Sequence, residues 1–373
     1  RSYSGYPITA GEKDKSEGRV RYAEYIPEND FLKMEIFLDK SSAEIFFGEG
    51  ELTMSLLSYN PEQAEKIIFS CDRKKRFRFL IDLISVQGEF ETMNKKICIA
   101  VVGCGRIATN AHFPAFKALS ERVRVKYACD VIEAKAQAKK DEYPDLVENV
   151  VTDYKLALAD KEVDAVYVLT PNYAHYTVTM DALRAGKHVF CEKPITVNYK
   201  LSLEMAEEAK KQGKLLNIGV CNRYNKAVEM LEQMNRNGKF GNIYHVYCSF
   251  RSFRSIPGLG GAFTTKAQSG GGVLIDWGVH FLDLILYILG GAKLKTVTCD
   301  AYSEMAKDMK AYKYNFMWAE DTKDLNGTND VDDYIAGHIR TDKASISFNG
   351  AWAQNIAQDE MFIDFLGDKG GAR

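Results

Sequence analysis

Hydrophobic and polar positions follow two different patterns along the chain, and the change comes near residue 93. Before it, short runs separated by turn residues predict β-strands at residues 31–39, 42–47 and 52–59. After it, runs that are apolar throughout alternate with helical patterns, which is typical of buried parallel strands joined by helices. The pattern predicts an all-β segment followed by α/β structure.

The α/β segment contains two kinds of strand. Continuously apolar strands are expected at residues 96–105, 123–130, 163–170, 188–194 and 214–221, with helices between them at residues 107–120, 132–143, 175–186 and 201–213. Longer and more alternating strands follow, at residues 241–253, 334–340, 344–353 and 361–367. We therefore expect an all-β module at 1–92, a doubly wound α/β domain at 94–220, and an α/β domain with an open, largely antiparallel sheet at 221–373.

Composition adds few constraints. A formal net charge of −2 over 373 residues gives no general attraction to nucleic acid or acidic membranes. The basic run at 72–79 fits a nucleic-acid patch less well than a solvated hairpin. Eight scattered cysteines without a CxxC pair favour reduced thiols in the cytoplasm over disulfides or a zinc site. No run of about 18 uninterrupted apolar residues indicates a membrane span, so neither nucleic acid nor membrane is an expected partner.

The sequence VVGCGRIA has the spacing of a dinucleotide-binding turn between a strand and a helix. Such a turn places a pyrophosphate against free N–H groups at the helix N-terminus. We expect this role for Gly103, Gly105, Arg106, Ile107 and Ala108. A tight turn without a ligand is the alternative.

Asp130 ends the second strand, where a carboxylate can accept hydrogen bonds from the adenosine ribose. A 2′-phosphate would meet this negative charge, so NAD is favoured over NADP.

Two further segments end strands of the same sheet, and ligands bind at the carboxyl ends of such strands. Thr170, Pro171, Asn172 and His175 are expected to line the crevice, and Glu192 and Lys193 of VFCEKP to point toward the cofactor. A surface Glu-Lys pair beside a proline is the alternative for the second segment.

The segment SGGGVLIDWGVHFLD (269–283) carries two carboxylates and an imidazole on an apolar helix. With α-helical geometry, Asp276, His280 and Asp283 lie along one stripe. Three interpretations are open: a metal site, a core histidine held by Asp276 or Asp283, and a proton-transfer pair that removes a hydroxyl proton as a hydride leaves.

In combination, GCGRIA, TPNYAH, AGKHVFCEKP and GGGVLIDWGVHFLDL resemble the glucose-fructose oxidoreductase / inositol dehydrogenase / MocA (Gfo/Idh/MocA) family from about Met93 onward. The resemblance implies a Rossmann domain, a C-terminal domain whose open sheet often forms oligomers, and a nicotinamide cofactor. It implies that Lys193 lies at the reacting oxygen and that Asp276 and His280 form the proton-transfer pair. Arg223 matches an arginine motif in which Asn225 replaces the usual proline. The family's chain continues past DFLGDKGGAR, so the last strands are expected to be missing.

The stretch FLDKSSAEIFFGEGELTMS resembles the C-terminal β-sandwich module of glycoside hydrolase family 32 enzymes. The catalytic propeller of those enzymes is absent, so no hydrolysis is expected from this module. The two resemblances together suggest two neighbouring sugar-utilisation genes joined in one frame.

These features predict an NAD-dependent enzyme that transfers a hydride to or from a hydroxyl carbon of a sugar or polyol. The expected assembly is a homo-oligomer formed through the C-terminal sheet. Three alternatives remain: a non-catalytic sensor that binds NAD and sugar, an NAD-dependent glycosidase, and carbohydrate binding by the first module.

Overall fold

The computed structural model describes residues 96–315, 319 and 323–373, together with five strands among the first 95 residues. The chain divides into two units, Arg1–Gly88 and Glu89–Arg373. In the first unit, β1 and β2 form an antiparallel pair and β3, β4 and β5 an antiparallel sheet. The bounds are β1 Tyr6–Ala10, β2 Arg21–Tyr25, β3 Met34–Asp39, β4 Ser42–Phe47 and β5 Leu52–Leu57. The remainder of the expected sandwich, including the basic run at 72–79, lies outside the described residues.

The second unit begins with a parallel sheet of six strands in the order β11-β10-β9-β6-β7-β8. The order reverses between β6 and β9, which is where a doubly wound sheet opens its ligand crevice. The predicted Rossmann fold is confirmed. The strands are β6 Ile97–Val102, β7 Val123–Cys129, β8 Val147–Val151, β9 Ala165–Val168, β10 His188–Cys191 and β11 Leu216–Ile218.

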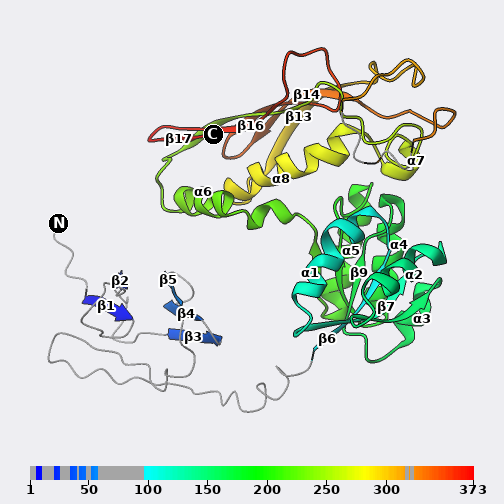
Figure 1. Ribbon diagram of the computed structural model, residues 1–373. Helices are drawn as coiled ribbons and strands as arrows, with labels where there is room; N and C mark the ends of the chain where they lie inside the picture. Colours follow the sequence, from blue (N-terminus) through cyan, green and yellow to red (C-terminus); the bar gives the residue numbers. More distant parts are fainter. Residues whose placement is uncertain are drawn as a thin grey trace. The chain divides into compact units, whose positions relative to one another are not determined.

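Helices connect these strands, and their ends follow from local sequence (Figure 1). Asn198 caps the N-terminus of α5 by accepting a hydrogen bond from the Lys200 amide, and Gly213 ends the helix with a φ of 61°. The helical segments are η3 Ala108–His112, α1 Phe113–Ala118, α2 Glu133–Glu142, α3 Tyr154–Ala159, η4 Asn172–Ala174, α4 His175–Arg184 and α5 Tyr199–Gln212.

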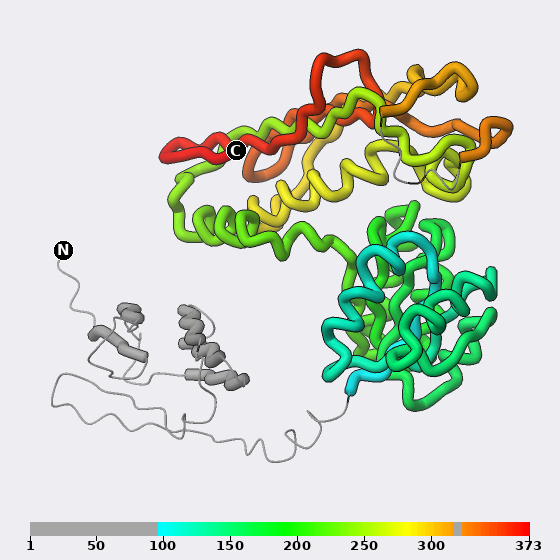
Figure 2. Tube along the Cα trace, viewed as in Figure 1, coloured from blue at the N-terminus to red at the C-terminus, as the bar shows by residue number. Residues whose placement is uncertain are grey.

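The C-terminal domain is built on a second sheet of six strands, ordered β13-β14-β15-β12-β16-β17. Among the described strands of this sheet, only β12 and β15 pair in parallel, so the largely antiparallel sheet is confirmed. In Figure 2 the yellow-green trace of β12 lies among orange and red strands from the end of the chain. The strands are β12 Ile243–Arg251, β13 Leu294–Tyr302, β14 Tyr334–Thr341, β15 Ser345–Ala351, β16 Glu360–Gly367 and β17 Gly371–Ala372.

The helices of this domain cover one face of the sheet (Figure 1). Ile285 and Ile288 of α8 are buried, and Phe281 stacks on Phe250 of β12 at 4.8 Å between ring centroids. The helical segments are η5 Cys221–Tyr224, α6 Lys226–Arg236, α7 Lys266–Ser269, η6 Leu274–Gly278 and α8 Val279–Ile288.

Among the described residues, the helical stretch Lys266–Ile288 is by length and composition able to cross a membrane. This is weak evidence, because the core helix of a soluble protein has the same properties. The stretch carries Asp276, His280 and Asp283, and its apolar side packs on the sheet.

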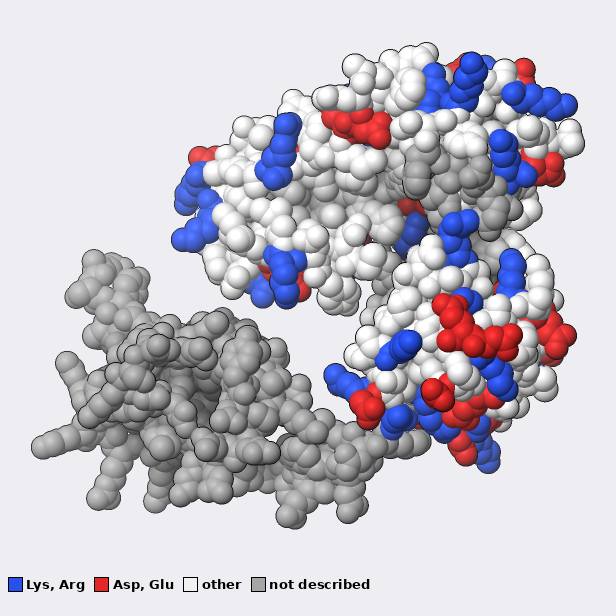
Figure 3. Space-filling view, viewed as in Figure 1, with Lys and Arg blue, Asp and Glu red and all other residues white. Residues whose placement is uncertain are grey.

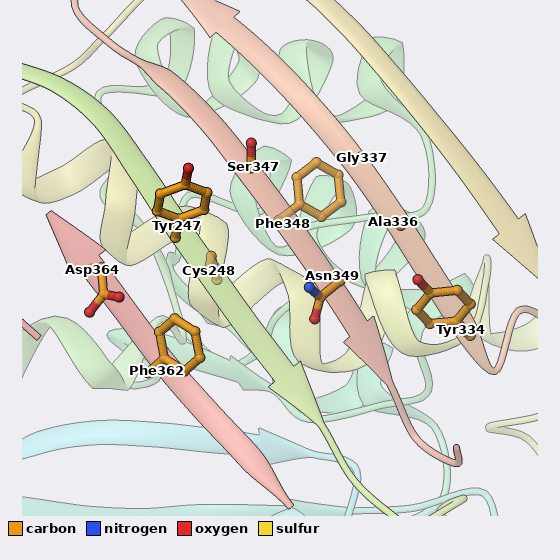
Figure 4. A pocket seen from close by; sticks show the side chains of 10 residues that line it. All are labelled: Tyr247, Cys248, Tyr334, Ala336, Gly337, Ser347, Phe348, Asn349, Phe362 and Asp364. Carbon is orange, nitrogen blue, oxygen red and sulfur yellow. The ribbon is translucent and has the colours of Figure 1, made fainter. Parts of the chain in front are cut away.

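Among the described residues of the large unit, no helix covers the opposite face of the C-terminal sheet (Figure 1). Tyr247, Tyr334, Phe362 and Asn349 line a shallow hollow of about 400 Å³ on it (Figure 4). Charged side chains of both signs crowd the visible face of the nucleotide-binding domain, whereas much of the visible C-terminal domain carries neither sign (Figure 3).

Candidate active site

The glycine turn is built as the sequence predicts. Gly103 has a φ of 100°, and a Cβ on it would lie 2.5 Å from the carbonyl oxygen of Leu169. The Leu169 amide in turn donates to the Val102 carbonyl at 2.8 Å. The turn therefore lies at the adjoining carboxyl ends of β6 and β9, where only glycine fits.

Gly105 differs from Gly103, because a Cβ on it would meet nothing within 4 Å. Packing of the protein does not explain this glycine, whereas close approach of a ligand does. The helix begins directly after it at Arg106, and Ile107 follows. Thr170 adds a buried hydroxyl that has no partner in the protein. The donors and the open backbone at this edge fit a dinucleotide.

Asp130 holds the turn as well as facing the crevice edge. Its Oδ2 accepts from the Cys104 amide and its Oδ1 from the Ile132 amide, both at 2.9 Å. The carboxylate thus fixes the loop between the two glycines. Each oxygen keeps a further acceptor position for a ribose hydroxyl.

The segment after β9 supports the crevice through its backbone. His175 is buried, with Nδ1 2.7 Å from the Pro194 carbonyl and Nε2 2.8 Å from the Thr170 carbonyl. Burial lowers the pKa of His175, although both carbonyls act in the opposite direction. Pro171 starts the short η4 turn, and Asn172 donates from Nδ2 to the Ser269 carbonyl at 2.9 Å. These residues therefore join the glycine side of the crevice to α7, which shortly precedes the η6 turn that carries Asp276.

Lys193 and Asp276 form the centre of the site. Lys193 Nζ donates to Asp276 Oδ1 at 3.0 Å and to its carbonyl oxygen at 3.1 Å. The second carboxylate oxygen accepts from Nε1 of the buried Trp352 at 3.2 Å. The lysine and aspartate side chains are 21 % and 10 % exposed, so the pair is shielded from water. Trp352 was absent from the sequence prediction because nothing near it in the chain marks it as functional.

His280 follows Asp276 by one turn, and its ring is poised to remain neutral. Its Nδ1 is buried without a hydrogen-bond partner. Burial lowers the pKa of His280 and the positive charge of Lys193 lowers it further, against the weaker opposing effect of Asp276. The interpretation as a core histidine held by a carboxylate is therefore wrong. A neutral imidazole beside a lysine can accept a proton.

Asp283 does not belong to this pair. Arg223 binds it with two hydrogen bonds, including one from Nε to Oδ2 at 2.8 Å, and stacks over Tyr287 at 5.0 Å. Asn225, where the related motif has proline, caps α6 by accepting from the Ala227 amide at 2.9 Å. The single stripe expected from α-helical spacing is also altered, because residues Leu274–Gly278 form a π-helical turn.

Asp276, His280 and Asp283 also form no metal site. Within the described residues, no group of three or more His, Cys, Asp or Glu side chains is arranged to hold a metal ion.

Sequence reasoning missed a second partly buried pair in the site. His112 Nε2 lies 2.7 Å from Oε1 of Glu192, and Oε2 of Glu192 accepts from the Lys193 amide at 3.1 Å. The residues are 80 positions apart, so only the sheet order β6–β9–β10 could have suggested their contact.

Comparison with known families now identifies the two halves of the large unit. Residues 97–220 match the model "Oxidoreductase family, NAD-binding Rossmann fold", and residues 228–373 match the "GFO/IDH/MocA C-terminal domain". The chain is 30 % identical over 276 residues to D-glucoside 3-dehydrogenase of Escherichia coli, covering 74 % of this chain and 76 % of that protein. The chain belongs to the Gfo/Idh/MocA family of oxidoreductases. Residues 1–83 match "Glycosyl hydrolases family 32 C terminal".

Other similar proteins match over a shorter stretch or at lower identity. A putative UDP-kanosamine synthase oxidoreductase subunit of Amycolatopsis mediterranei is 32 % identical over 220 residues, 58 % of this chain and 59 % of that one. The solved structure of a levoglucosan dehydrogenase with NADH and levoglucosan has a TM-score of 0.63 at 20 % identity, covering 74 % of this chain and 72 % of that one. This likeness shows that the two chains share a fold.

Proposed function

We propose that this Gfo/Idh/MocA protein is an NAD-dependent dehydrogenase or reductase acting on a hydroxyl carbon of a sugar or polyol. The observation that carries the proposal is the shielded Lys193–Asp276 pair, with a neutral His280 one helical turn after Asp276. Lys193 follows a strand of the same sheet whose β6 leads into the glycine turn. Two similar proteins are named D-glucoside 3-dehydrogenase and levoglucosan dehydrogenase, and these names support a sugar as the substrate.

The cofactor would be held by the chain's own backbone and two side chains. The turn at Gly103 and Gly105 would face the pyrophosphate, and Asp130 the ribose hydroxyls, which favours NAD over NADP. Thr170, which follows β9, offers its unpartnered hydroxyl to the cofactor. When bound, the nicotinamide supplies the acceptor or donor of the hydride.

The remaining chemistry belongs to Lys193, Asp276 and His280. Lys193 donates a hydrogen bond to the reacting oxygen, which stabilises the negative charge that develops there. Asp276 fixes the lysine by accepting from Nζ and is itself fixed by Trp352. His280 Nε2 accepts the hydroxyl proton during oxidation and returns it during reduction.

A panel of neutral sugars, sugar alcohols and glycosides, assayed with NAD⁺ or NADH at 340 nm, tests this function. A substrate-dependent absorbance change that disappears in Lys193→Met supports it. Cleavage of an aryl glycoside without net change in NADH would instead indicate a glycosidase. Sugar and NADH binding without turnover in wild type would indicate a sensor.

We propose further that a second copy of the chain covers the open face of the C-terminal sheet. Tyr247 and Tyr302 are about half exposed on this face, and the hollow between the strands is lined by rings (Figure 4). Light scattering should give a dimer or larger species that Tyr247→Asp dissociates. Tyr199→Asp, on an exposed position of α5, is the matched control and should leave the mass unchanged.

A further inference from the structure

His112 and Glu192 form a contact that the proposed reaction does not yet use. His112 ends the helical segment after the glycine turn, and Glu192 directly follows β10. Their side chains are 12 % and 14 % exposed, with 2.7 Å between Nε2 and Oε1. A carboxylate this shielded requires hydrogen-bond donors, because burial alone would disfavour its charge.

The surroundings hold both side chains in place. The His112 ring packs edge-on against Tyr167 and Phe190, at 5.9 and 5.3 Å between centroids. Gly219 leaves room for the carboxylate, since a Cβ there would lie 2.9 Å from Glu192 Oε2. The contact is therefore built from β9, β10 and the residue after β11.

Glu192 in turn holds the backbone of Lys193 in place. Its Oε2 accepts from the Lys193 amide, while the Lys193 side chain reaches Asp276 in the other domain. The backbone of Lys193 is thus set by Glu192 and its ammonium group by Asp276. Movement of the Glu192 carboxylate would displace the start of the lysine side chain.

We propose that His112 is a positioning residue for Lys193, acting by donating a hydrogen bond from Nε2 to the Glu192 carboxylate. This role rests on the proposed dehydrogenase function and adds a residue from the first helix to its machinery. A displacement of about 1 Å at a reacting group can lower a rate by about 100-fold.

The ionisation of Glu192 makes the role measurable. Burial raises the pKa of Glu192, but the hydrogen bond and charge of His112, with the Lys193 amide, bring that pKa below its ordinary value. When the His112 donor is removed, burial raises the pKa of Glu192 without that opposing effect. The carboxyl group of Glu192 then takes up a proton at higher pH. A protonated carboxyl group accepts less well from the Lys193 amide.

The experiment compares His112→Leu, which cannot donate, with His112→Gln, whose amide can. We expect kcat of His112→Leu to fall by about 10- to 100-fold, with the KM for sugar and the Kd for NADH within about threefold of wild type. The acid limb of kcat should move to higher pH. His112→Gln should recover most of kcat. The control is His188→Gln, at the opposite end of β10, where His188 Nδ1 accepts a hydrogen bond from the Leu215 amide.

Two results would overturn the proposal. One is a His112→Leu protein with wild-type kcat and acid limb. The other is equal loss in the leucine and glutamine variants, which would show that ring packing matters and N–H donation does not. If His112→Leu fails to fold, Glu192→Gln takes its place. When the amide nitrogen of this glutamine faces the Lys193 N–H, it cannot accept a hydrogen bond from it. We therefore expect kcat to fall while NADH affinity is unchanged. A wild-type kcat in Glu192→Gln would also overturn the positioning role of His112.

A second readout does not depend on turnover. The ¹⁵N spectrum of the six histidine rings, with His112 assigned by its loss in His112→Gln, should show His112 protonated at Nε2 in the cofactor-free protein. A ring protonated only at Nδ1 would end the proposal even if the enzyme is active. Absence of sugar turnover in wild type with an Nε2–H signal present would count against the dehydrogenase function alone.

Discussion

Lys193 Nζ lies 3.0 Å from Oδ1 of Asp276, although one residue belongs to the nucleotide-binding domain and the other to the C-terminal domain. This contact joins the end of strand β10 to a π-helical turn 83 residues later. The site is therefore complete only when both domains are folded and in contact.

Removing the amine of Lys193 should impair chemistry more than cofactor binding. We expect Lys193→Met to lower kcat/KM for the sugar by about 1,000-fold, because a charged donor to the reacting oxygen is lost, while NADH affinity changes little. Steady-state rates and NADH fluorescence titration measure the two quantities. Lys200→Met, on the exposed side of α5, is the control. Comparable loss in both variants would contradict the assignment.

The pH dependence of oxidation should report His280. Burial and the charge of Lys193 hold the pKa of His280 below its ordinary value, so the ring stays neutral and able to accept a proton to a lower pH than a free imidazole does. Asp276→Asn removes an influence that raises this pKa, so the acid limb should move to still lower pH. Lys193→Met removes one that lowers it, so its residual activity should show a limb at higher pH. Profiles of kcat/KM for both variants test the opposite signs.

Gly103→Ala and Gly105→Ala should fail in different ways. Gly103 has a positive φ and faces the Leu169 carbonyl, so alanine there should cost about 3 kcal/mol or more of unfolding free energy. Gly105 faces open space, so alanine there should leave Tm unchanged and weaken NADH binding. Thermal unfolding and NADH titration of both proteins separate the effects. Full NADH affinity in Gly105→Ala would remove the pyrophosphate assignment.

Asp130 should determine the choice of cofactor. Asp130→Ala removes an acceptor for the ribose hydroxyls and should weaken NAD binding by about tenfold or more, with a smaller loss for NADP. Asp153→Ala provides the comparison, because Asp153 follows the neighbouring strand β8 and caps α3. Its cofactor affinities should equal those of wild type. If Asp130→Ala lost equal affinity for NAD and NADP, the only remaining role of Asp130 would be to accept the hydrogen bond from the Cys104 amide.

The sequence predicted the parts of the fold that depend on continuous burial. Strand β6 is buried from Cys98 to Val102 and reads as one apolar run before its glycines. Strand β13 was missed because it is exposed along its whole length, so burial leaves no run of large apolar residues in its sequence. Strand β8 was missed because exposed Glu148 and Asn149 interrupt its five residues.

Contacts between residues far apart in the sequence limited how much of the site could be predicted. Lys193, Asp276 and His280 could be proposed because each stands in a distinctive short motif. The partner of Asp283 could not, since Arg223 lies 60 residues away in another element. The π-helical turn likewise has no signature in the spacing, so the α-helical stripe placed Asp276 only approximately.

The indole of Trp352 touches the carboxylate of Asp276, and it is one of three tryptophans in the chain. An indole's emission responds to the field of a charge at this range. Occupation of the crevice by a sugar that draws Lys193 away from Asp276 would therefore change the protein's own ultraviolet fluorescence. The molecule contains an optical reporter of ligand entry that requires no dye and no turnover.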